Sequence, residues 1–232
     1  MNLRAGLRLY AITDSRLLRQ GQTLEGQVAA ALRGGATMVQ LREKFLEDDA
    51  LRQLALRVKA VTDAFGVPLI LNDRADLAAE LGAAGAHLGP DDGDLREART
   101  RLDRAGPGRI LGATARTVER ALAAEAAGAD YLGCGAVFGT STKADASLMP
   151  LSLLREICAA VRLPVVAIGG IDRTNLPSLL NQRGPQGKAL RDSVAGVAVA
   201  SGIFAAEDVE AAARELTGVL HMTSAPPLNV DS

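Results

Sequence analysis

The sequence is poor in aromatic residues: tryptophan is absent, and aromatic residues make up only 3% of its 232 positions. Proteins that hold nucleic acid by base stacking rely on such rings. The net charge of −1 also supplies no electrostatic attraction for a phosphate backbone or an anionic membrane surface. We therefore expect neither a nucleic-acid partner nor a membrane partner.

Cysteine is nearly as scarce, since only Cys134 and Cys158 are present, and both lie in apolar segments without metal-ligand spacing. We interpret them as buried free thiols, which are typical of a reducing cytoplasm. No apolar run is long enough to span a bilayer. Residues 1–14 lack the apolar core of a signal peptide. These features predict a cytoplasmic protein.

What the sequence does contain is a regular alternation of short apolar runs with amphipathic helical patterns, such as Leu24–Arg33 and Val118–Ala127. The runs are continuously apolar, which indicates strands buried on both faces of a parallel sheet. The predicted strands are Leu9–Thr13, Met38–Arg42, Leu69–Asn72, Ala86–Leu88, Ile110–Thr114, Tyr131–Val137, Val165–Ile168 and Gly196–Ala200.

Helix ends in this pattern carry recognisable caps. Several predicted helices stop at glycine just before the next strand, where a left-handed cap is expected; these glycines are Gly34, Gly35, Gly66, Gly82 and Gly128. Residues 94–97, Asp-Leu-Arg-Glu, form a capping box that should open the fourth helix of the repeat.

Eight strand–helix repeats in a chain of this length predict a single (β/α)8 TIM barrel, an α/β fold. A doubly wound open sheet would need a GxGxxG turn after the first strand, and none follows Thr13. We assign residues 1–221 to the barrel and expect the polar, proline-bearing residues 222–232 to be a disordered tail. Residues 181–193 read as a long loop at the opposite end from the active site, with no functional role.

Active sites of such barrels lie at the carboxyl ends of the strands, and nearly every predicted end here is polar or glycine. Gly169-Gly170 and Ser201-Gly202 follow the last two strands, the usual place for phosphate binding by backbone N–H groups. The alternative is that both are tight turns that need glycine for backbone reasons alone.

Asp73 and Asp92 follow neighbouring predicted strands, so their carboxylates can converge. Paired hard oxygens without histidine or thiolate suit Mg²⁺. In the alternative interpretation, Asp92 or Asp91 caps a helix and Asp73 pairs with Arg74 at the surface.

Three cations, Arg42, Lys44 and Lys143, also fall at strand ends. Together with a metal they predict a highly anionic ligand such as a diphosphate, whereas a solvated surface charge is the ordinary fate of any one lysine. His87 is interpreted as a hydrogen-bonded core residue, because no arrangement for nucleophilic catalysis accompanies it. Three consecutive hydroxyls, Thr140 to Thr142, have no apolar partner and favour ligand binding.

Seven motifs in these positions resemble the thiamine-phosphate synthase family. They extend from Leu9 to about Leu220 and are LYAITD (9–14), QLREK (40–44), LNDR (71–74), HLGPDD (87–92), GTSTKADA (139–146), AIGGI (167–171) and VAVASGI (197–203). The resemblance implies a Mg²⁺-dependent transferase. It would condense 4-amino-2-methyl-5-(diphosphooxymethyl)pyrimidine with a thiazole phosphate, giving thiamine phosphate and pyrophosphate.

The resemblance also implies roles for individual residues. The pyrimidine diphosphate would be held by Gln40, Leu41, Arg42, Glu43, Lys44, Asn72, Thr114 and Lys143. The thiazole phosphate would be held by Thr140, Ser141, Thr142, Gly169, Gly170, Ala200 and Ser201. Asp73 and Asp92 would bind Mg²⁺, and Arg42, Lys44 and Lys143 would be catalytic. Small phosphorylated molecules are thus the expected partners, and a homo-oligomer is left open.

Three positions depart from the family pattern: Gly139 replaces a common proline, Pro90 a common glutamine, and Thr114 a common serine. No charge is lost, so we expect activity to survive. A thiazole tautomerase-like relative is an alternative, but where that group has a histidine this chain has Arg116, which is no base at neutral pH. A non-catalytic barrel that binds thiamine precursors is a second alternative; it would not need both aspartates and all three cations.

Overall fold

Eight parallel strands close into a barrel in the order β1-β2-β3-β4-β5-β6-β7-β8, as predicted. The computed structural model describes residues 2–139 and 148–222. The strands are β1 (Leu9–Ile12), β2 (Met38–Leu41), β3 (Leu69–Asn72), β4 (Gly85–Leu88), β5 (Ile110–Thr114), β6 (Tyr131–Gly135), β7 (Val165–Ile168) and β8 (Gly196–Val199). Their bounds differ from the predicted ones by at most two residues at either end.

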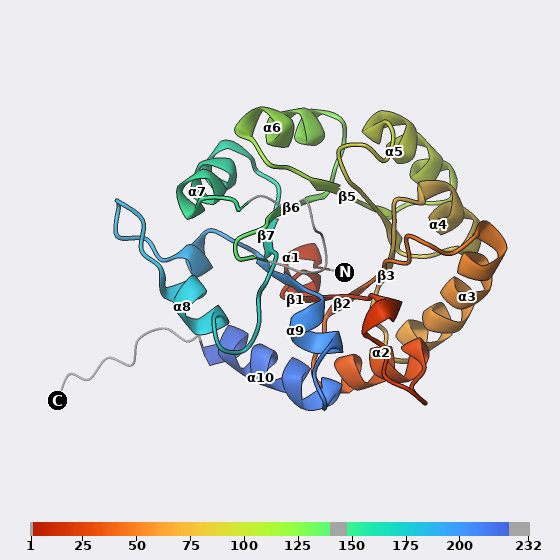
Figure 1. Cartoon of the computed structure of the whole chain (residues 1–232). Coiled ribbons are helices and arrows are strands. Elements are labelled where there is room, and N and C mark those ends of the chain that lie inside the picture. The colour runs from red at the N-terminus through yellow and green to blue at the C-terminus, as the bar shows by residue number, and fades with distance from the viewer. Residues whose placement is uncertain (1, 140–147, 223–232) are drawn as a thin grey trace.

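Helices surround the barrel as an outer ring (Figure 1). Those following the strands are α2 (Leu24–Arg33), α3 (Asp48–Ala64), α4 (Ala75–Leu81), α5 (Leu95–Arg104), α6 (Val118–Ala126), α7 (Leu151–Ala160), α8 (Leu176–Asn181) and α10 (Val209–Met222). Two short turns, η1 (Ser15–Leu17) and η2 (Leu190–Asp192), lie in loops. None of the helices within these described ranges has both the length and the apolarity needed to cross a membrane.

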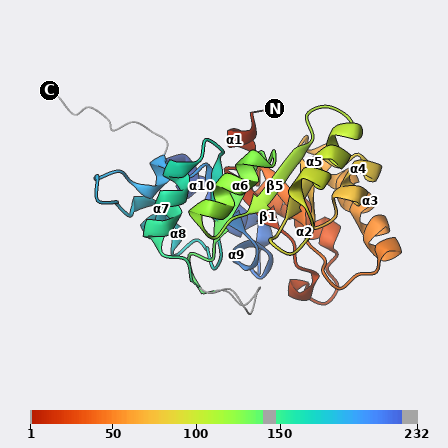
Figure 2. The ribbon, with the colours of Figure 1, turned by 90° about the horizontal axis from the view of Figure 1, so that it is seen from above.

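Two four-residue helices lie at opposite ends of the barrel (Figure 2). The first, α1 (Leu3–Gly6), precedes β1, whereas α9 (Ser201–Phe204) directly follows β8 at the end where the strands terminate. Leu7, just after α1, is fully buried and packs into the barrel interior, and Leu3 packs beside it. The amino-terminal end of the barrel is therefore filled by apolar side chains.

Alternate strand residues belong to two separate apolar layers, as the period of a β-strand requires. Leu9 and Ala11 of β1 pack in the layer between strands and helices. Tyr10 and Ile12 of the same strand point into the barrel, where they meet residues such as Tyr131. The inner layer is the smaller one, and it carries both tyrosines of the chain.

The predicted caps are largely present. Gly82 ends α4 in the left-handed region with φ 65°, and Gly35, Gly66 and Gly128 also have positive φ. Gly34 is the exception: its φ of −74° is helical, and close packing on α10 is what excludes a side chain there. Asp94 opens α5 by accepting hydrogen bonds from the backbone N–H groups of Arg96 and Glu97.

Residues 181–193 form a short hairpin-like turn with a bridge between Arg183 and Ala189. The Arg155 side chain of α7 holds this turn by donating hydrogen bonds to the carbonyls of Gln182 (2.6 Å) and Lys188 (3.2 Å). That the segment has no functional role stays a prediction. The division at residue 221 likewise stays a prediction: α10 runs to Met222, and the remainder of the tail lies outside the described residues.

Candidate active site

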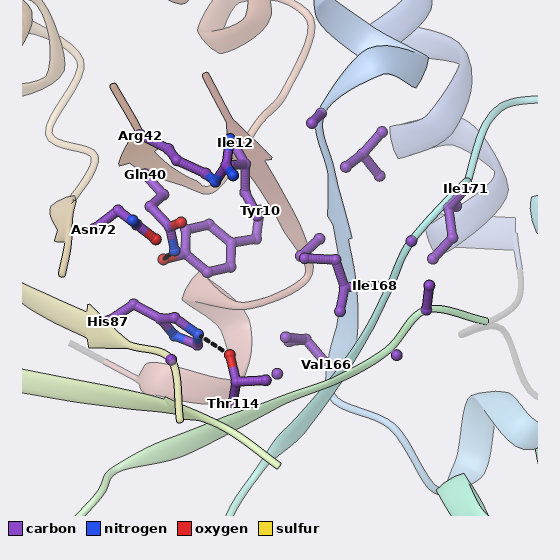
Figure 3. A pocket seen from close by; sticks show the side chains of 18 of the residues that line it. Tyr10, Ile12, Gln40, Arg42, Asn72, His87, Thr114, Val166, Ile168 and Ile171 are labelled. Carbon is purple, nitrogen blue, oxygen red and sulfur yellow. Dashed lines mark hydrogen bonds between the residues drawn. The ribbon is translucent and has the colours of Figure 1, made fainter. Parts of the chain in front are cut away.

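The carboxyl ends of the strands surround a cavity of about 170 Å³ (Figure 3). Side chains or backbone from all eight strands or the loops after them line it. The predicted site residues among its walls are Gln40, Arg42, Lys44, Asn72, Asp73, Asp92, Thr114, Gly169, Gly170, Ala200 and Ser201. Residues that lie as far apart in the sequence as Gln40 and Ser201 are thus brought to one place.

Leu41 and Glu43 are placed differently. The Leu41 side chain points away from the cavity and packs between strands and helices. The Glu43 carboxylate accepts hydrogen bonds from the Thr13 hydroxyl (3.1 Å) and the Ser15 backbone N–H (3.2 Å). Alternation along a strand explains both, because Gln40 and Arg42 take the inward positions. Of the remaining predicted residues, Thr140, Ser141, Thr142 and Lys143 lie outside the described residues.

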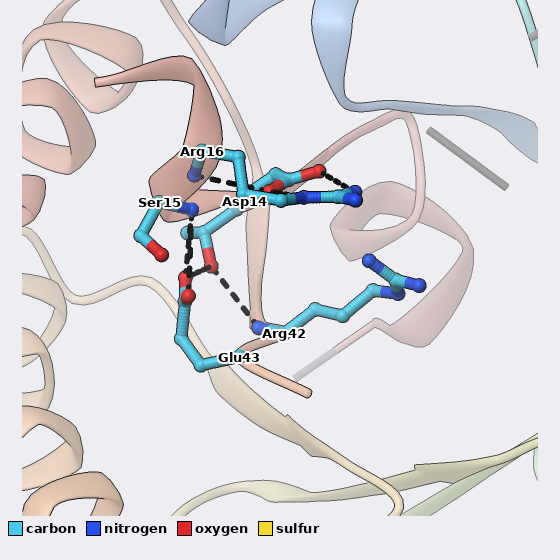
Figure 4. Close-up of polar contacts among 6 residues, drawn as sticks. Asp14, Ser15, Arg16, Arg42 and Glu43 are labelled. Carbon is cyan, nitrogen blue, oxygen red and sulfur yellow. Dashed lines mark hydrogen bonds and ion pairs between the residues drawn. The ribbon is translucent and has the colours of Figure 1, made fainter. Parts of the chain in front are cut away.

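A polar brace fixes the loop after β1 against the loop after β2 (Figure 4). The Thr13 hydroxyl donates to Glu43 and accepts from the Arg42 backbone N–H at 3.0 Å. Asp14, only 4% exposed, receives the Arg16 guanidinium at 2.8 and 2.5 Å, and this contact holds the pKa of the Asp14 carboxyl below its usual range. The brace sets the backbone from which Arg42 reaches the cavity. We did not predict it, although LYAITD contains two of its members.

Two carboxylates converge in the cavity, as predicted from Asp73 and Asp92. Burial raises the pKa of Asp73 to about 6, and the neighbouring Asp92 carboxylate adds to the rise, while Lys44 opposes it. The Lys44 ammonium lies 3.3 Å from Asp73 Oδ2, and Asp92 Oδ2 accepts from the Gly89 backbone N–H at 2.8 Å. Like charges held this close make a site that favours a bound cation.

The alternative interpretation of these aspartates is wrong. Arg74 forms its ion pairs with Asp48 and Asp76, whereas Asp73 pairs with Lys44. The helix after β4 is capped by Asp94, which leaves Asp92 facing the cavity. No third His, Cys, Asp or Glu joins the two carboxylates within residues 2–139 and 148–222. A two-carboxylate, oxygen-only site suits Mg²⁺, which keeps water and phosphate oxygens among its ligands.

Gly169 and Gly170 lie in the cavity wall after β7 with positive φ angles of 102° and 61°. A Cβ on Gly169 would lie 2.4 Å from the Cβ of Ala136, and one on Gly170 would lie 2.3 Å from the Gly139 carbonyl oxygen. Both positions therefore need glycine for backbone reasons. They also leave the wall free of side chains beside Ser201, so the turn and ligand-binding interpretations are compatible.

The floor of the cavity holds a chain of hydrogen bonds that joins Gln40 to Thr114 through Tyr10, Tyr131 and His87. Burial lowers the pKa of His87 to about 4 and raises the pKa of both tyrosines. His87 is therefore a neutral, hydrogen-bonded core residue, as predicted. The tyrosines were missed, although a phenol inside an otherwise apolar strand needs a buried partner and could have signalled one.

Comparison with known proteins finds matches over the part of the chain that contains the residues lining this cavity. The family described as thiamine monophosphate synthase matches residues 9–203 of the chain. The chain belongs to this family. Similar proteins include thiamine-phosphate synthase 2 of Streptococcus pneumoniae, 44% identical over 94% of this chain and 97% of the relative. The thiamine-phosphate synthase of Lacticaseibacillus paracasei is 44% identical over 88% of this chain and 89% of its own length.

Among solved structures, the thiamine phosphate pyrophosphorylase of Pyrococcus furiosus is similar, with a TM-score of 0.82 and 36% identity. The match covers 97% of this chain and all of the other. Membership in the thiamine monophosphate synthase family makes this chain a transferase that condenses pyrimidine and thiazole phosphates. Six of the seven motifs contribute residues to its cavity, and the seventh, GTSTKADA, lies outside the described residues apart from Gly139.

Proposed function

We propose that the cavity catalyses this condensation by ionising the pyrimidine diphosphate. The carbon–oxygen bond to the diphosphate breaks with both electrons leaving on oxygen. The resulting pyrimidinylmethyl cation is captured by the lone pair of the thiazole nitrogen, which forms the new carbon–nitrogen bond. Thiamine phosphate and pyrophosphate are the products.

The observation that carries this mechanism is that two cations and two carboxylates meet in one cavity, as a diphosphate and a metal ion would require. Arg42 and Lys44 line it, and its one histidine is neutral and hydrogen-bonded through both ring nitrogens. Ionisation needs charge neutralisation and alignment, and no proton has to be removed from a reacting carbon. The cavity thus supplies what ionisation demands, and where a tautomerase-like relative has its histidine the cavity wall has Arg116, which is no base at neutral pH.

We assign Mg²⁺ to Asp73 and Asp92. Burial and then the neighbouring Asp92 carboxylate raise the pKa of Asp73, and a divalent cation would favour the charged form of both carboxylates. Bound there, the ion would offset the negative charge of the departing diphosphate. Lys44 would contribute from the other side of Asp73, and Arg42 and Lys143 would bind the diphosphate oxygens.

The thiazole phosphate is assigned to the opposite wall. Gly169 and Gly170 supply backbone without side chains, and Ala200 and Ser201 line the same part of the cavity. The hydroxyls of residues 140–142 follow β6, the strand next to β7, and belong to the same proposed subsite. Gln40, Asn72 and Thr114 would hold the pyrimidine ring deeper in the barrel.

We infer a reducing, cytoplasmic setting from the thiols. Cys134 and Cys158 are both free, and burial raises their pKa values to about 12 and about 11. Cys158 is near enough to add to the raised pKa of Cys134, yet the two form no disulfide. Cys134 is buried, as predicted, whereas Cys158 is only half-buried. Free, protonated thiols of this kind fit a compartment that keeps cysteine reduced.

Pyrophosphate release with both substrates tests the proposal. We expect release only when both substrates are present, its loss on adding EDTA, and its recovery when Mg²⁺ is restored in excess. Proton exchange on the thiazole without pyrophosphate release would favour a tautomerase. Binding of the precursors without turnover would favour a non-catalytic barrel, and either result would overturn the proposal.

A further inference from the structure

Five polar side chains from five different strands form an unbroken chain of hydrogen bonds across the barrel. Gln40 Nε2 lies 2.7 Å from the Tyr10 hydroxyl, which lies 2.8 Å from the Tyr131 hydroxyl. The Tyr131 hydroxyl lies 3.0 Å from His87 Nδ1, and His87 Nε2 lies 3.0 Å from the Thr114 hydroxyl. Tyr10, Tyr131, His87 and Gln40 are each at most 8% exposed. Water therefore has little access to the inner links.

Glycines on the neighbouring strands leave room for this chain. Gly112 of β5 is paired with both His87 and Tyr131. A Cβ at Gly112 would lie 2.4 Å from the Tyr131 hydroxyl and 2.5 Å from His87 Nδ1, on the hydrogen bond itself. At Gly133 of β6 a Cβ would lie 3.2 Å from the His87 ring. The sequence of the barrel interior thus accommodates the polar chain as a unit.

The direction of the chain follows from counting hydrogens. Each hydroxyl has one hydrogen, and a neutral imidazole has one on a single nitrogen. The Gln40 amide nitrogen donates to Tyr10, and the Tyr10 hydrogen has an acceptor in the chain only if Tyr10 donates to Tyr131. In that arrangement Tyr131 donates to His87 Nδ1, and His87 Nε2 donates to Thr114. The Thr114 hydrogen is then left over. Within the described part of the chain, His87 is the one hydrogen-bond partner of the Thr114 hydroxyl, which lines the cavity.

We propose that this chain runs in one direction from Gln40 to Thr114 and makes the Thr114 hydroxyl a dedicated hydrogen-bond donor to the bound pyrimidine diphosphate. Tyr10, Tyr131 and His87 are then positioning residues that act through Thr114. The proposal rests on the proposed function, which assigns Gln40 and Thr114 to that substrate. A reversed chain would require the Gln40 amide to turn over, and Thr114 would then offer the substrate only an acceptor.

The direction of the hydrogen-bond chain determines which polar groups the ligand must present. A group that faces Thr114 must accept a hydrogen bond, as a ring nitrogen or a phosphate oxygen does. At the other end, Gln40 donates to Tyr10 and keeps its amide oxygen and its second N–H hydrogen for the ligand. The ligand must therefore present an acceptor to Thr114, and a neighbouring donor and acceptor to the Gln40 amide. An aminopyrimidine carries this pattern of donors and acceptors.

Nitrogen NMR of the histidine rings tests the direction without any substrate. The polypeptide has two histidines, His87 and the exposed His221, so the spectrum of His87→Gln identifies the His87 signals. At pH 7 we expect the proton on Nε2 and none on Nδ1. In Tyr131→Phe, which keeps the ring but removes the donor to Nδ1, an Nδ1–H population should appear. A proton on Nδ1 in the unsubstituted protein, or an unchanged tautomer in Tyr131→Phe, would overturn the proposal.

Steady-state kinetics test the positioning role. Tyr10→Phe, Tyr131→Phe and Thr114→Val should raise KM for the pyrimidine substrate roughly fivefold to tenfold, the range for one lost hydrogen bond, with KM for the thiazole unchanged. Thr114→Ser should retain the original value. Thr62→Val is the matched control, because Thr62 is a fully buried hydroxyl in α3, outside the cavity, that donates to the Lys59 carbonyl.

The outcomes separate the two proposals. If both KM values rise together, or if Thr62→Val has the same effect, the positioning role is wrong, since loss of stability alone would explain the change. If the unsubstituted protein releases no pyrophosphate from its substrates, the proposed function fails. The ring tautomer of His87 still decides the direction of the chain in that case.

Discussion

Asp73 is held in a backbone conformation that few residues adopt. Its φ of 63° is in the left-handed region, where Asn, Asp and Gly are enriched, and its backbone N–H donates to the His87 carbonyl at 2.8 Å. The turn directs its carboxylate toward Asp92 and Lys44. A strained residue whose neighbours fix it in place is common where a group must meet a ligand.

Replacing Asp92 tests whether the two carboxylates bind Mg²⁺. We expect Asp92→Ala to need more Mg²⁺ for half-maximal rate, or to lose turnover, while its unfolding transition stays close to that of the unsubstituted protein. Asp91→Ala is the matched control, since Asp91 is the exposed neighbour and does not line the cavity. Initial rates over a Mg²⁺ titration measure the effect. Identical titration curves for both variants would contradict the assignment.

His87 should make stability depend on pH in a defined window. Its pKa is lowered from 6.5 to about 4, so the folded state binds fewer protons than the unfolded state below pH 6.5. The contribution of His87 is therefore complete above pH 6.5 and is lost as the pH falls toward 4. Between pH 7 and 4.5 the free energy of unfolding should fall by about 2.5 kcal/mol on this account.

Urea unfolding at both pH values checks this expectation. In His87→Gln the fall between pH 7 and pH 4.5 should be smaller by that amount, whatever the substitution does to stability at pH 7. His221→Gln, which alters the exposed histidine, should retain the full fall. An equal fall in all three proteins would show that His87 protonates as readily in the folded as in the unfolded state.

At the scale of elements, the strands were easy to predict and their inward faces were not. Continuous apolar runs such as Val165–Ile168 locate a buried strand, but they do not say which residues face the barrel interior, because both faces are apolar. Tyr10 and Tyr131 escaped prediction for that reason, as did the outward direction of Leu41 and the bracing contact of Glu43. The polar strand ends were predictable because a chain must place them where water or a ligand can reach them.

Gly112→Ala should disturb one strand-to-strand contact severely. The added Cβ would lie between the Tyr131 hydroxyl and His87 Nδ1, so we expect a loss of about 1–3 kcal/mol from overpacking and a weaker pyrimidine site. Gly218→Ala in α10 is the control, because nothing lies within 4 Å of its Cβ position. That change should stabilise the helix by up to about 1 kcal/mol. Urea unfolding compares the two; equal stabilities would mean that β5 can shift without penalty.

The loop after β6 should show a division of labour. If Lys143 stabilises the departing diphosphate, Lys143→Ala should lower kcat by an amount corresponding to about 2–4 kcal/mol of barrier. Thr140→Ala should mainly raise KM for the thiazole phosphate, which does not react. Both residues lie outside the described part of the chain, so this expectation rests on the family resemblance. The same kinetic signature in both variants would refute the division.

For the molecule as a whole, periodicity was sufficient to predict the barrel, since each repeat of strand and helix must bury two faces of its strand. Closure then brings together residues such as Arg42, Asp92 and Gly170, which no local pattern connects. The sequence was therefore sufficient to predict which residues come together at the carboxyl ends of the strands. How the meeting residues divide their hydrogen bonds depends on distances of a few ångströms, which only the folded chain fixes.

The apolar side chains at α1 and Leu7 fill the amino-terminal end of the barrel, and this affects how substrates reach the cavity. In the described part of the chain the cavity lies at the carboxyl ends of the strands, so we expect both substrates to enter from that end. If the pyrimidine substrate lies next to Gln40 and Thr114, as proposed, we expect it to bind before the thiazole phosphate, which would lie by Gly170 and Ser201. We expect the products to leave in the reverse order, so that the product nearest the opening of the cavity is released first.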